Sequence, residues 1–282
     1  MVLILFGSLP GRNLQHPACI FFDVKGKVYA MHQSILTILQ QVAEGHKTPE
    51  QALQNIKLAS YQQLSSGLCL DTNRRLRTGQ GEVVFAPNKS LIQLQEATAE
   101  LFGHGYPVLV TRLTLEQGQS LAQDFPQGTF WPQSGLFCLG KNLHLDPPWP
   151  DQAKVLVVTA GASDLPVALE AVGSGMFFDL DIGLIPDVGV AGLHRLTPHL
   201  PSLQQASLLI VVAGMEGALP SVLAGMLGKP IIAVPTSVGY GVSMHGLAAL
   251  AGMLSSCATG IAVVNIDNGF GAAAMADKLI SG

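Results

Sequence analysis

The chain has 282 residues, of which only 12% are Asp, Glu, Lys or Arg, and its formal net charge is −4. This balance offers no basic surface for nucleic acid or an anionic membrane, so both are excluded as expected partners. The four cysteines (Cys19, Cys69, Cys138 and Cys257) form no C-x-x-C pair. That spacing argues against a disulfide scaffold or a zinc knuckle and favours the reducing cytoplasm. With 48% hydrophobic residues, the low charge also indicates surface buried between subunits.

The first part of the chain predicts a small helical appendage. Residues 20–29 are compatible with a short hairpin, and residues 33–43 have the apolar spacing of a helix. A second helix is expected after Thr48, because Thr48, Pro49 and Gln51 supply the cap, the first helical position and the capping box.

Residues 70–89 concentrate basic side chains, with three arginines within residues 74–77 and Lys89 downstream. Such a cluster suits a phosphate or carboxylate ligand, although a solvated surface turn explains the charges equally well. Residues 82–85, 90–102 and 107–110 then predict strand, helix and strand, a small α/β unit. Residues 113–153 are rich in Gln, Pro and Gly and are interpreted as a connector, which divides the chain into domains 1–150 and 151–282.

From residue 154 onward, continuous apolar strands alternate with helices. The expected strands are 155–158, one within 177–185, 208–212, 231–234 and 261–264, which predicts a parallel sheet covered on both faces. Residues 230–266 lack charged side chains, but Ser255, Ser256 and Thr259 interrupt the run and no basic or aromatic belt flanks it, so no membrane span is expected.

Polar and glycine-rich turns follow these strands, where ligands of such sheets bind. After the first strand, Gly161, Ser163 and Asp164 form a candidate phosphate cradle, or only a helix cap. After the second, His194 and Arg195 have the chemistry to handle a proton and an anion, or a structural role. After the third, Glu216 stands in an apolar turn, where loss of hydration would favour its protonated form and suit it to acid–base work.

The last turns add further candidates. Residues 235–241 follow the fourth strand with three hydroxyls and two glycines, and residues 265–271 follow the fifth with a polar, glycine-broken turn before an alanine-rich helix. Strand, glycine turn and helix together let backbone N–H groups meet an anion. Cys257 lies just ahead of the fifth strand, either as a reactive thiol or as a small buried apolar residue.

These motifs carry a family resemblance. GASD, GVAGLHRL, VAGMEGALPSV, IAVPTSVGYG and NIDNGFGAA occur in the order and spacing of the aminoimidazole-ribonucleotide carboxylase (PurE-type) family. More specifically, the chain resembles the LarB family of nickel-pincer cofactor biosynthesis, densely over residues 151–282 and sparsely over 71–89, where Gly81 stands in place of an expected proline. The resemblance implies an α/β fold: a C-terminal PurE-like three-layer domain with a parallel sheet, preceded by a small helical and α+β region.

The resemblance also implies an activity. Members carboxylate C5 of the pyridinium ring of nicotinic acid adenine dinucleotide with CO2 or bicarbonate, and cleave its phosphoanhydride to give pyridinium-3,5-biscarboxylic acid mononucleotide and AMP. A thiolate that adds at C4 would make C5 nucleophilic, and Cys257 is the cysteine in the matched region. Mg2+ is expected as a cofactor, with ligands that the sequence does not identify.

Further roles follow from the same resemblance. The implied catalytic residues besides Cys257 are Glu216 as base, Asp187 and His194. The implied substrate-binding residues are Gly161, Ser163, Asp164, Arg195, Ser237, Tyr240, Asp267, Asn268, Arg74, Arg77 and Lys89, the last three for the AMP half or the pyrophosphate.

Two alternatives remain, a PurE-type aminoimidazole ribonucleotide mutase and a non-catalytic nucleotide-binding protein. The mutase would need neither Cys257 nor the arginine segment. Because Cys257 precedes a strand whereas the other candidates follow strands, it should lie at the opposite edge of the sheet. We therefore expect a homo-oligomer, an octamer by the PurE resemblance, whose site combines Cys257 of one chain with Glu216 of another.

Overall fold

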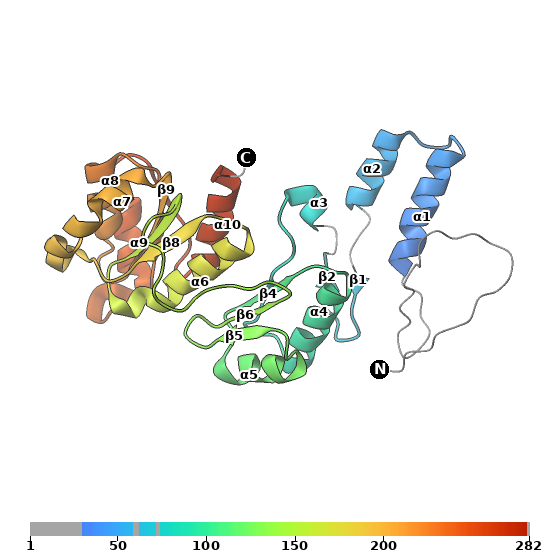
Figure 1. Ribbon diagram of the computed structural model, residues 1–282, viewed down its shortest axis with the longest axis horizontal. Coiled ribbons are helices and arrows are strands. Elements are labelled where there is room, and N and C mark those ends of the chain that lie inside the picture. The colour runs from blue at the N-terminus through green and yellow to red at the C-terminus, as the bar shows by residue number, and fades with distance from the viewer. Residues whose placement is uncertain (1–29, 59–61, 72–73, 281–282) are drawn as a thin grey trace. The chain divides into compact units, whose positions relative to one another are not determined.

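The computed structural model describes residues 30–58, 62–71 and 74–280 (Figure 1). The chain divides into two compact units, residues 1–60 and residues 61–282. The hairpin expected at residues 20–29 lies outside the described residues.

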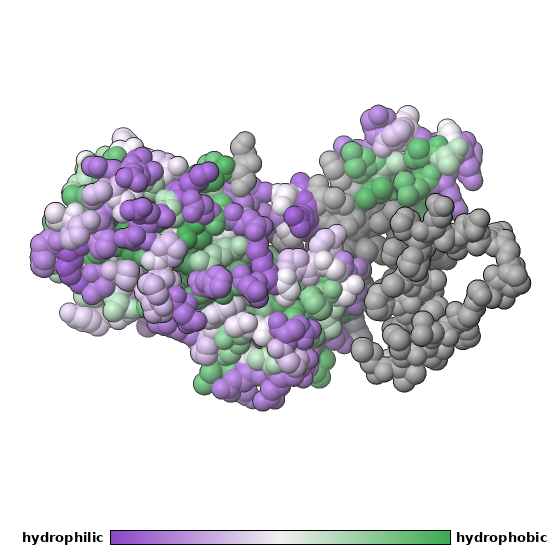
Figure 2. Space-filling view, in the orientation of Figure 1, coloured by the Kyte–Doolittle hydropathy of each residue, from purple (hydrophilic) through white to green (hydrophobic). Residues whose placement is uncertain are grey.

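The described residues of the first unit form a pair of helices, α1 (Ala30–Ala43) and α2 (Pro49–Leu58). The capping box at the start of α2 is confirmed, since the backbone N–H groups of Thr48 and Gln51 each donate to the other residue's side chain. Leu36, Leu39 and Leu53 are exposed, and Figure 2 shows an apolar patch on this helix pair.

The second unit begins with a small lobe. A two-stranded antiparallel ladder, β1 (Gln62–Gln63) and β2 (Cys69–Leu70), precedes the short helix α3 (Arg74–Thr78). A four-stranded sheet follows, in the order β3-β4-β6-β5, with β3 parallel to β4 and the other pairs antiparallel. Its strands are β3 (Val84–Phe85), β4 (Val108–Thr111), β5 (Thr129–Trp131) and β6 (Leu136–Leu139). Two helices, α4 (Leu91–Gly103) and α5 (Leu115–Asp124), share a core with this sheet.

The interpretation of residues 113–153 as a connector is wrong. These residues contain α5, β5 and β6, and β6 is fully buried within the small sheet. Thr114 and Gln117 form a capping box at the start of α5, as Ser90 and Gln93 do at the start of α4. The strand–helix–strand unit expected before it is confirmed as β3, α4 and β4.

The C-terminal lobe is built on a five-stranded parallel sheet in the order β11-β10-β9-β7-β8. Its strands are β7 (Val155–Thr159), β8 (Ile182–Ile185), β9 (Leu208–Ala213), β10 (Ile231–Pro235) and β11 (Ile261–Val263). The four strands β7 to β10 are buried throughout, as their continuous apolar runs predict. The α/β fold with a parallel C-terminal sheet and a smaller N-terminal region is therefore confirmed.

Helices cover both faces of this sheet. The α6 (Leu165–Phe177) and α10 (Gly269–Ile280) helices pack on one face, and α7 (Leu200–Gln205), α8 (Leu219–Leu227) and α9 (Leu247–Leu254) pack on the other. Short 3-10 segments η1 (Ala162–Asp164), η2 (Val190–Arg195), η3 (Thr197–His199) and η4 (Gly241–Gly246) lie in the connections. The α9 helix begins only at Leu247, because Met244, His245 and Gly246 before it have positive φ.

The two lobes share one hydrophobic core. Leu109 and Leu136 of the small sheet belong to the same buried cluster as Val172 of α6 and Val157 of β7. The boundary expected at residue 150 therefore falls inside one compact unit, between two lobes that bury apolar surface against each other. Across the described ranges, no helix is long and apolar enough to cross a membrane.

Candidate active site

A cleft of about 290 Å³ lies at the carboxyl ends of β7, β8 and β9. β7 and β9 are neighbours in the sheet but not in the chain, so the connections after them leave in opposite directions and open a crevice. Gly161, Ser163, Asp164, Arg195 and Glu216 contribute to its lining. The structure thus brings five of the residues selected from the sequence to one place.

Two glycines let the backbone of these loops approach closely. A Cβ at Gly189 would lie 2.4 Å from the carbonyl oxygen of Ala160, and one at Gly214 would lie 2.3 Å from that of Val238. Any side chain at either position would have to push the loops apart. The glycines therefore fix the shape of the cleft wall.

Asp164 is the buried charged group of this cleft. Its Oδ1 accepts a 2.6 Å hydrogen bond from Thr236 Oγ1, and its Oδ2 accepts a 2.9 Å bond from the backbone N–H of Gly161. Burial raises the pKa of Asp164, while the bonds from Thr236 and from the Gly161 and Gly214 backbone oppose that rise. Asp164 therefore ties the loops after β7 and β10 together and holds a carboxyl group at the cleft floor.

Asp187 and Arg195 form an ion pair with 2.8 Å between Oδ2 and Nη1, and both side chains are substantially exposed. The backbone N–H of Asp187 donates to Thr159 Oγ1, which anchors the loop after β8 to the end of β7. Arg195 reaches the cleft lining, whereas His194 is exposed and is not part of the lining.

Glu216 lies at the mouth of the cleft with an exposed side chain. The sequence predicted a buried carboxylate at Glu216, but in a single chain this side chain is exposed. Met215 at φ 53° and Gly217 at φ 66° turn the backbone sharply around Glu216. Ser163 is exposed at the same opening. Both side chains are thus available to a ligand or to a second chain.

The loops after β10 and β11 are joined to each other. The backbone N–H of Ser237 donates to Asp267 Oδ1 at 2.8 Å, and Asn268 Oδ1 accepts from the Gly271 N–H at the start of α10. Asp267 and Asn268, assigned to substrate from the sequence, thus have structural partners. Tyr240 is 80% exposed at the tip of its loop.

Cys257 is exposed and lies between α9 and β11. Because β11 runs parallel to β10, a residue just before β11 lies at the amino edge of the sheet, opposite to the cleft. Ser256 Oγ hydrogen-bonds to Ser221 Oγ of α8 at 2.7 Å, which fixes this segment. One chain therefore does not bring Cys257 to the cleft.

The arginine segment also lies away from the cleft. Arg77 forms a bidentate pair with Asp71, and Lys89 Nζ donates to the Phe85 carbonyl at 2.7 Å. Arg74 is exposed, and none of the three cations lines the cleft. In a single chain these three side chains are therefore not placed to contact the AMP half or the pyrophosphate of a substrate bound in the cleft.

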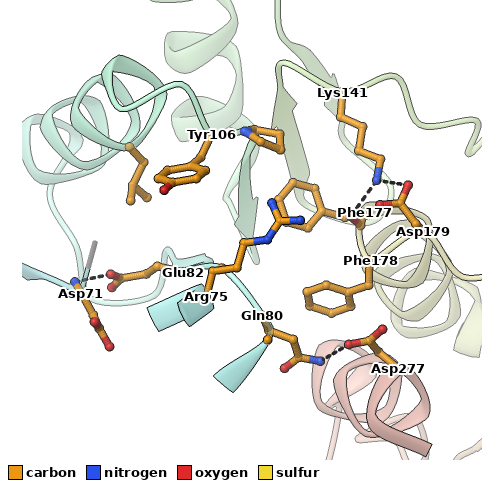
Figure 3. A pocket seen from close by; sticks show the side chains of 14 residues that line it. Asp71, Arg75, Gln80, Glu82, Tyr106, Lys141, Phe177, Phe178, Asp179 and Asp277 are labelled. Atoms are coloured by element: carbon orange, nitrogen blue, oxygen red, sulfur yellow. Dashed lines mark hydrogen bonds and ion pairs between the residues drawn. The ribbon is translucent and has the colours of Figure 1, made fainter. Parts of the chain in front are cut away.

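A second pocket, shown in Figure 3, lies beside this segment. Arg75 points into it towards Phe177, and Tyr106 and Glu82 form the opposite side. Burial raises the pKa of Glu82, opposed by the hydrogen bond from the Asp71 N–H. Of the three arginines in this segment, Arg75 lines the pocket of Figure 3, whereas Arg74 and Arg77 do not.

Gln80 connects the same segment to the C-terminal helix. Its amide donates to the Ala274 carbonyl at 3.0 Å and to Asp277 Oδ2 at 2.7 Å. Ala274 lies in the middle of α10 and Asp277 nearer its C-terminus, and this helix runs back from the carboxyl edge of the sheet. The pocket of Figure 3 is therefore separate from the cleft.

A bound divalent metal would need several His, Cys, Asp or Glu side chains close together. Within residues 30–58, 62–71 and 74–280, no group of three or more His, Cys, Asp and Glu side chains is placed to hold one. The described part of a single chain therefore offers no preformed protein cage for Mg2+.

The sequence interpretation missed Arg112 and Glu170. Arg112 Nε lies 3.1 Å from Glu170 Oε1, and its Nη2 donates to the Asp267 carbonyl oxygen. One signal was available, because Glu170 is the single carboxylate in the otherwise apolar α6. A charge that faces the core from such a helix needs a partner elsewhere in the fold.

Comparison with known proteins completes the description of this site. Residues 61–141 match the family model of the LarB/PurE-like N-terminal domain, and residues 154–282 match that of AIR carboxylase. The chain is 36% identical over 256 residues to the uncharacterised protein MJ0165 of Methanocaldococcus jannaschii, covering 87% of this chain and 96% of that protein. It is also 31% identical over 134 residues to the N5-carboxyaminoimidazole ribonucleotide mutase of the same organism, covering 45% of this chain and 78% of the mutase.

Proposed function

We propose a function from the premise that this chain belongs to the LarB family, in which a LarB/PurE-like N-terminal domain is joined to an AIR carboxylase domain. The family supports a PurE-type carboxylase-like role. In finer detail, the chain carboxylates C5 of the pyridinium ring of nicotinic acid adenine dinucleotide. It also hydrolyses the phosphoanhydride, which gives pyridinium-3,5-biscarboxylic acid mononucleotide and AMP.

The observation that carries this proposal is the exposed thiol of Cys257 in a chain that also has the PurE-like cleft. A pyridinium C5 is electron-poor and does not attack CO2 by itself. A mutase acting on an aminoimidazole ring starts from an electron-rich carbon and needs no thiol. An exposed cysteine in the carboxylase lobe therefore favours the pyridinium substrate over the mutase alternative.

The proposed carboxylation is redox-neutral. The Cys257 thiolate forms an S–C4 bond, which converts the pyridinium to a dihydropyridine whose C5 is an enamine carbon. C5 then forms a bond to CO2, and a base removes the proton from C5. The S–C4 bond breaks last, its electron pair returning to sulfur as the ring nitrogen restores the aromatic pyridinium.

The cleft offers groups for the remaining steps. Glu216 is our candidate for the base at C5, because its exposed carboxylate stands at the cleft mouth. Arg195 and the backbone around Gly161 and Ser163 suit the phosphate and carboxylate groups of a ribonucleotide. The similarity to a ribonucleotide mutase supports a ligand of that class. Asp187 holds Arg195 in place through their ion pair.

Mg2+ remains part of the proposal only as a partner of the substrate. A single chain lacks a metal cage among its described residues, and Mg2+ commonly binds through substrate phosphates with few protein carboxylates. The carboxylation steps above do not involve Mg2+. Phosphoanhydride cleavage is proposed from the family resemblance, without an assigned nucleophile.

The test is direct. The protein is incubated with nicotinic acid adenine dinucleotide, bicarbonate and Mg2+, and the products are analysed by mass spectrometry. AMP together with a mononucleotide heavier by one carboxylate supports the proposal. Turnover of N5-carboxyaminoimidazole ribonucleotide instead would identify a mutase, and binding of the dinucleotide without turnover would identify a nucleotide-binding protein.

We further propose that the active site is shared between chains of a homo-oligomer. Cys257 and Glu216 lie at opposite edges of the sheet within one chain. Five large apolar side chains between residues 240 and 254 are at least half exposed, which suits a contact between subunits: Tyr240, Val242, Met244, Leu247 and Leu254. Figure 2 shows further apolar residues at the surface of the C-terminal lobe.

Subunit exchange tests the shared site. Chains carrying Cys257→Ser and chains carrying Glu216→Gln are each expected to be inactive. Mixed oligomers should regain part of the activity, because some interfaces then combine an intact Cys257 with an intact Glu216. Mixed oligomers that are demonstrated by mass spectrometry but remain inactive would contradict a shared site.

A further inference from the structure

One small-lobe side chain reaches the loops at the carboxyl edge of the C-terminal sheet. Arg112 follows β4 with φ 58°, a left-handed conformation that a non-glycine residue rarely adopts. Its guanidinium bonds to Glu170 of α6 and to the backbone carbonyl of Asp267, and it lies 5.5 Å from the ring centroid of Phe85. The contact therefore crosses from one lobe to the other at the end of the sheet that carries the cleft.

Glu170 is the buried half of this contact. Its side chain is only 4% exposed, and its second oxygen accepts from the Phe270 N–H in the first turn of α10. Arg112 supplies the countercharge that a buried carboxylate needs, and the α10 N-terminus supplies backbone donors. Glu170 thus fixes the start of α10 only while Arg112 balances its charge.

From Asp267 the contacts continue into the candidate active site. Arg112 holds the carbonyl of Asp267, whose φ is 55°, and the carboxylate of Asp267 accepts from the Ser237 N–H. The residue before Ser237 is Thr236, which donates to Asp164 on the cleft floor. Arg112 is therefore connected to Asp164 through the loops after β11 and β10, by hydrogen bonds together with the covalent chain within Asp267 and from Ser237 to Thr236.

We propose that Arg112 is a positioning residue through which the small lobe sets the geometry of the catalytic loops after β10 and β11. Arg112 is not among the residues that line the cleft. Its effect on turnover passes through Glu170 and the Asp267 backbone. The inference rests on the proposed function for its kinetic readout, and it assigns to the LarB-type N-terminal lobe a physical task in catalysis.

Lys141 provides a matched control. It also crosses from the small lobe to α6, but at the other end of that helix, where its Nζ bonds to Asp179 at 2.6 Å and to the Phe177 carbonyl at 2.9 Å. Both cations lose an ion pair between the lobes when replaced by Met. Only Arg112 is connected to the loops of the cleft, so the comparison separates positioning from general stability.

The experiment compares Arg112→Met, Arg112→Lys and Lys141→Met with the wild type in steady-state kinetics, at a temperature where all are folded by circular dichroism. We expect Arg112→Met to lower kcat at least tenfold. Arg112→Lys should recover only part of this loss, because Lys cannot bond to Glu170 and Asp267 in the same fork geometry. Lys141→Met should leave kcat within about twofold. Equal kcat losses for the two Met variants, or none, would overturn the proposal.

A second readout does not depend on the substrate. Hydrogen exchange of the backbone N–H groups of Ser237 and Phe270 should accelerate at least tenfold in Arg112→Met and stay unchanged in Lys141→Met. Acceleration in both, or in neither, would overturn the positioning role. If the wild type turns over no dinucleotide but the exchange pattern holds, the proposed function fails while this inference stands.

Discussion

Thr236→Val isolates the hydrogen bond that Thr236 donates to Asp164. The two side chains have nearly the same shape, so the variant removes a hydroxyl without opening a cavity. Thr236 is fully buried, and Asp164 is 3% exposed. A hydrogen bond to a charged group contributes about 1.5–3 kcal/mol, against about 0.5–1.5 kcal/mol for a neutral one. The cost of the substitution should therefore depend on whether Asp164 is ionised.

The direction of this pH dependence follows from the pKa of Asp164. Burial raises that pKa above its ordinary value of 3.8, the bond from Thr236 lowers it, and the nearby charge of Asp267 raises it further. A carboxyl with a raised pKa contributes stability at low pH that is lost as the pH rises through the raised value. Without the Thr236 hydroxyl the pKa of Asp164 should rise further, because the ionised carboxylate loses a hydrogen-bond donor.

Urea unfolding from pH 4 to pH 8 measures the effect. Thr236→Val should lose about 1.5–3 kcal/mol of unfolding free energy where Asp164 is ionised and only about 0.5–1.5 kcal/mol where it is protonated, so the loss should grow from the acid to the alkaline end of this range. Thr236→Ser keeps the hydroxyl and loses one methyl, about 1 kcal/mol at every pH. Parallel pH profiles for the Val and Ser variants would refute the assigned role of this hydrogen bond.

Three further substitutions, one of them with a matched control, test the site. Cys257→Ser should abolish carboxylation while dinucleotide binding, measured by calorimetry, persists, because an alkoxide is far less accessible than a thiolate near neutral pH; near-normal turnover would exclude the thiol mechanism. Arg77→Ala should weaken dinucleotide binding by about 1.5–3 kcal/mol if this guanidinium grips phosphate, whereas unchanged affinity would leave it as the partner of Asp71 alone. Gly214→Ala should destabilise the fold by about 1–3 kcal/mol, because its Cβ would meet the Val238 carbonyl; Gly225→Ala, with nothing within 4 Å of its Cβ, should be neutral or stabilising in thermal unfolding.

The C-terminal sheet was predictable because its strands are buried on both faces. Runs such as residues 155–158 and 208–213 are apolar at every position, so they indicate strands without any knowledge of their partners. Because such strands run parallel, the turns after them lie at one edge of the sheet, which is why Gly161, Asp164 and Glu216 were found together.

The small lobe was harder to predict because its strands are short and its partners are distant in sequence. β5 has three residues and is only partly buried, and the composition of residues 113–153 resembles that of a loop. The burial expected for Glu216 was wrong for a related reason. Apolar neighbours in sequence say little about a side chain in a turn, and this turn directs Glu216 outwards. Arg112 and Glu170, 58 residues apart, gave no local signal as a pair.

The dimensions of the sheet decide how the proposed thiol chemistry can operate. β10 has five residues, so its two ends are roughly 16 Å apart at about 3.3 Å per residue. A pyridinium ring is far smaller than this distance and cannot contact Cys257 at one edge and Glu216 at the other. If the cysteine forms the C4 adduct and Glu216 takes the C5 proton, the two groups must come from different chains. Such an interface would also cover the exposed apolar side chains between residues 240 and 254, so the contact that completes the site would be the one that buries this surface.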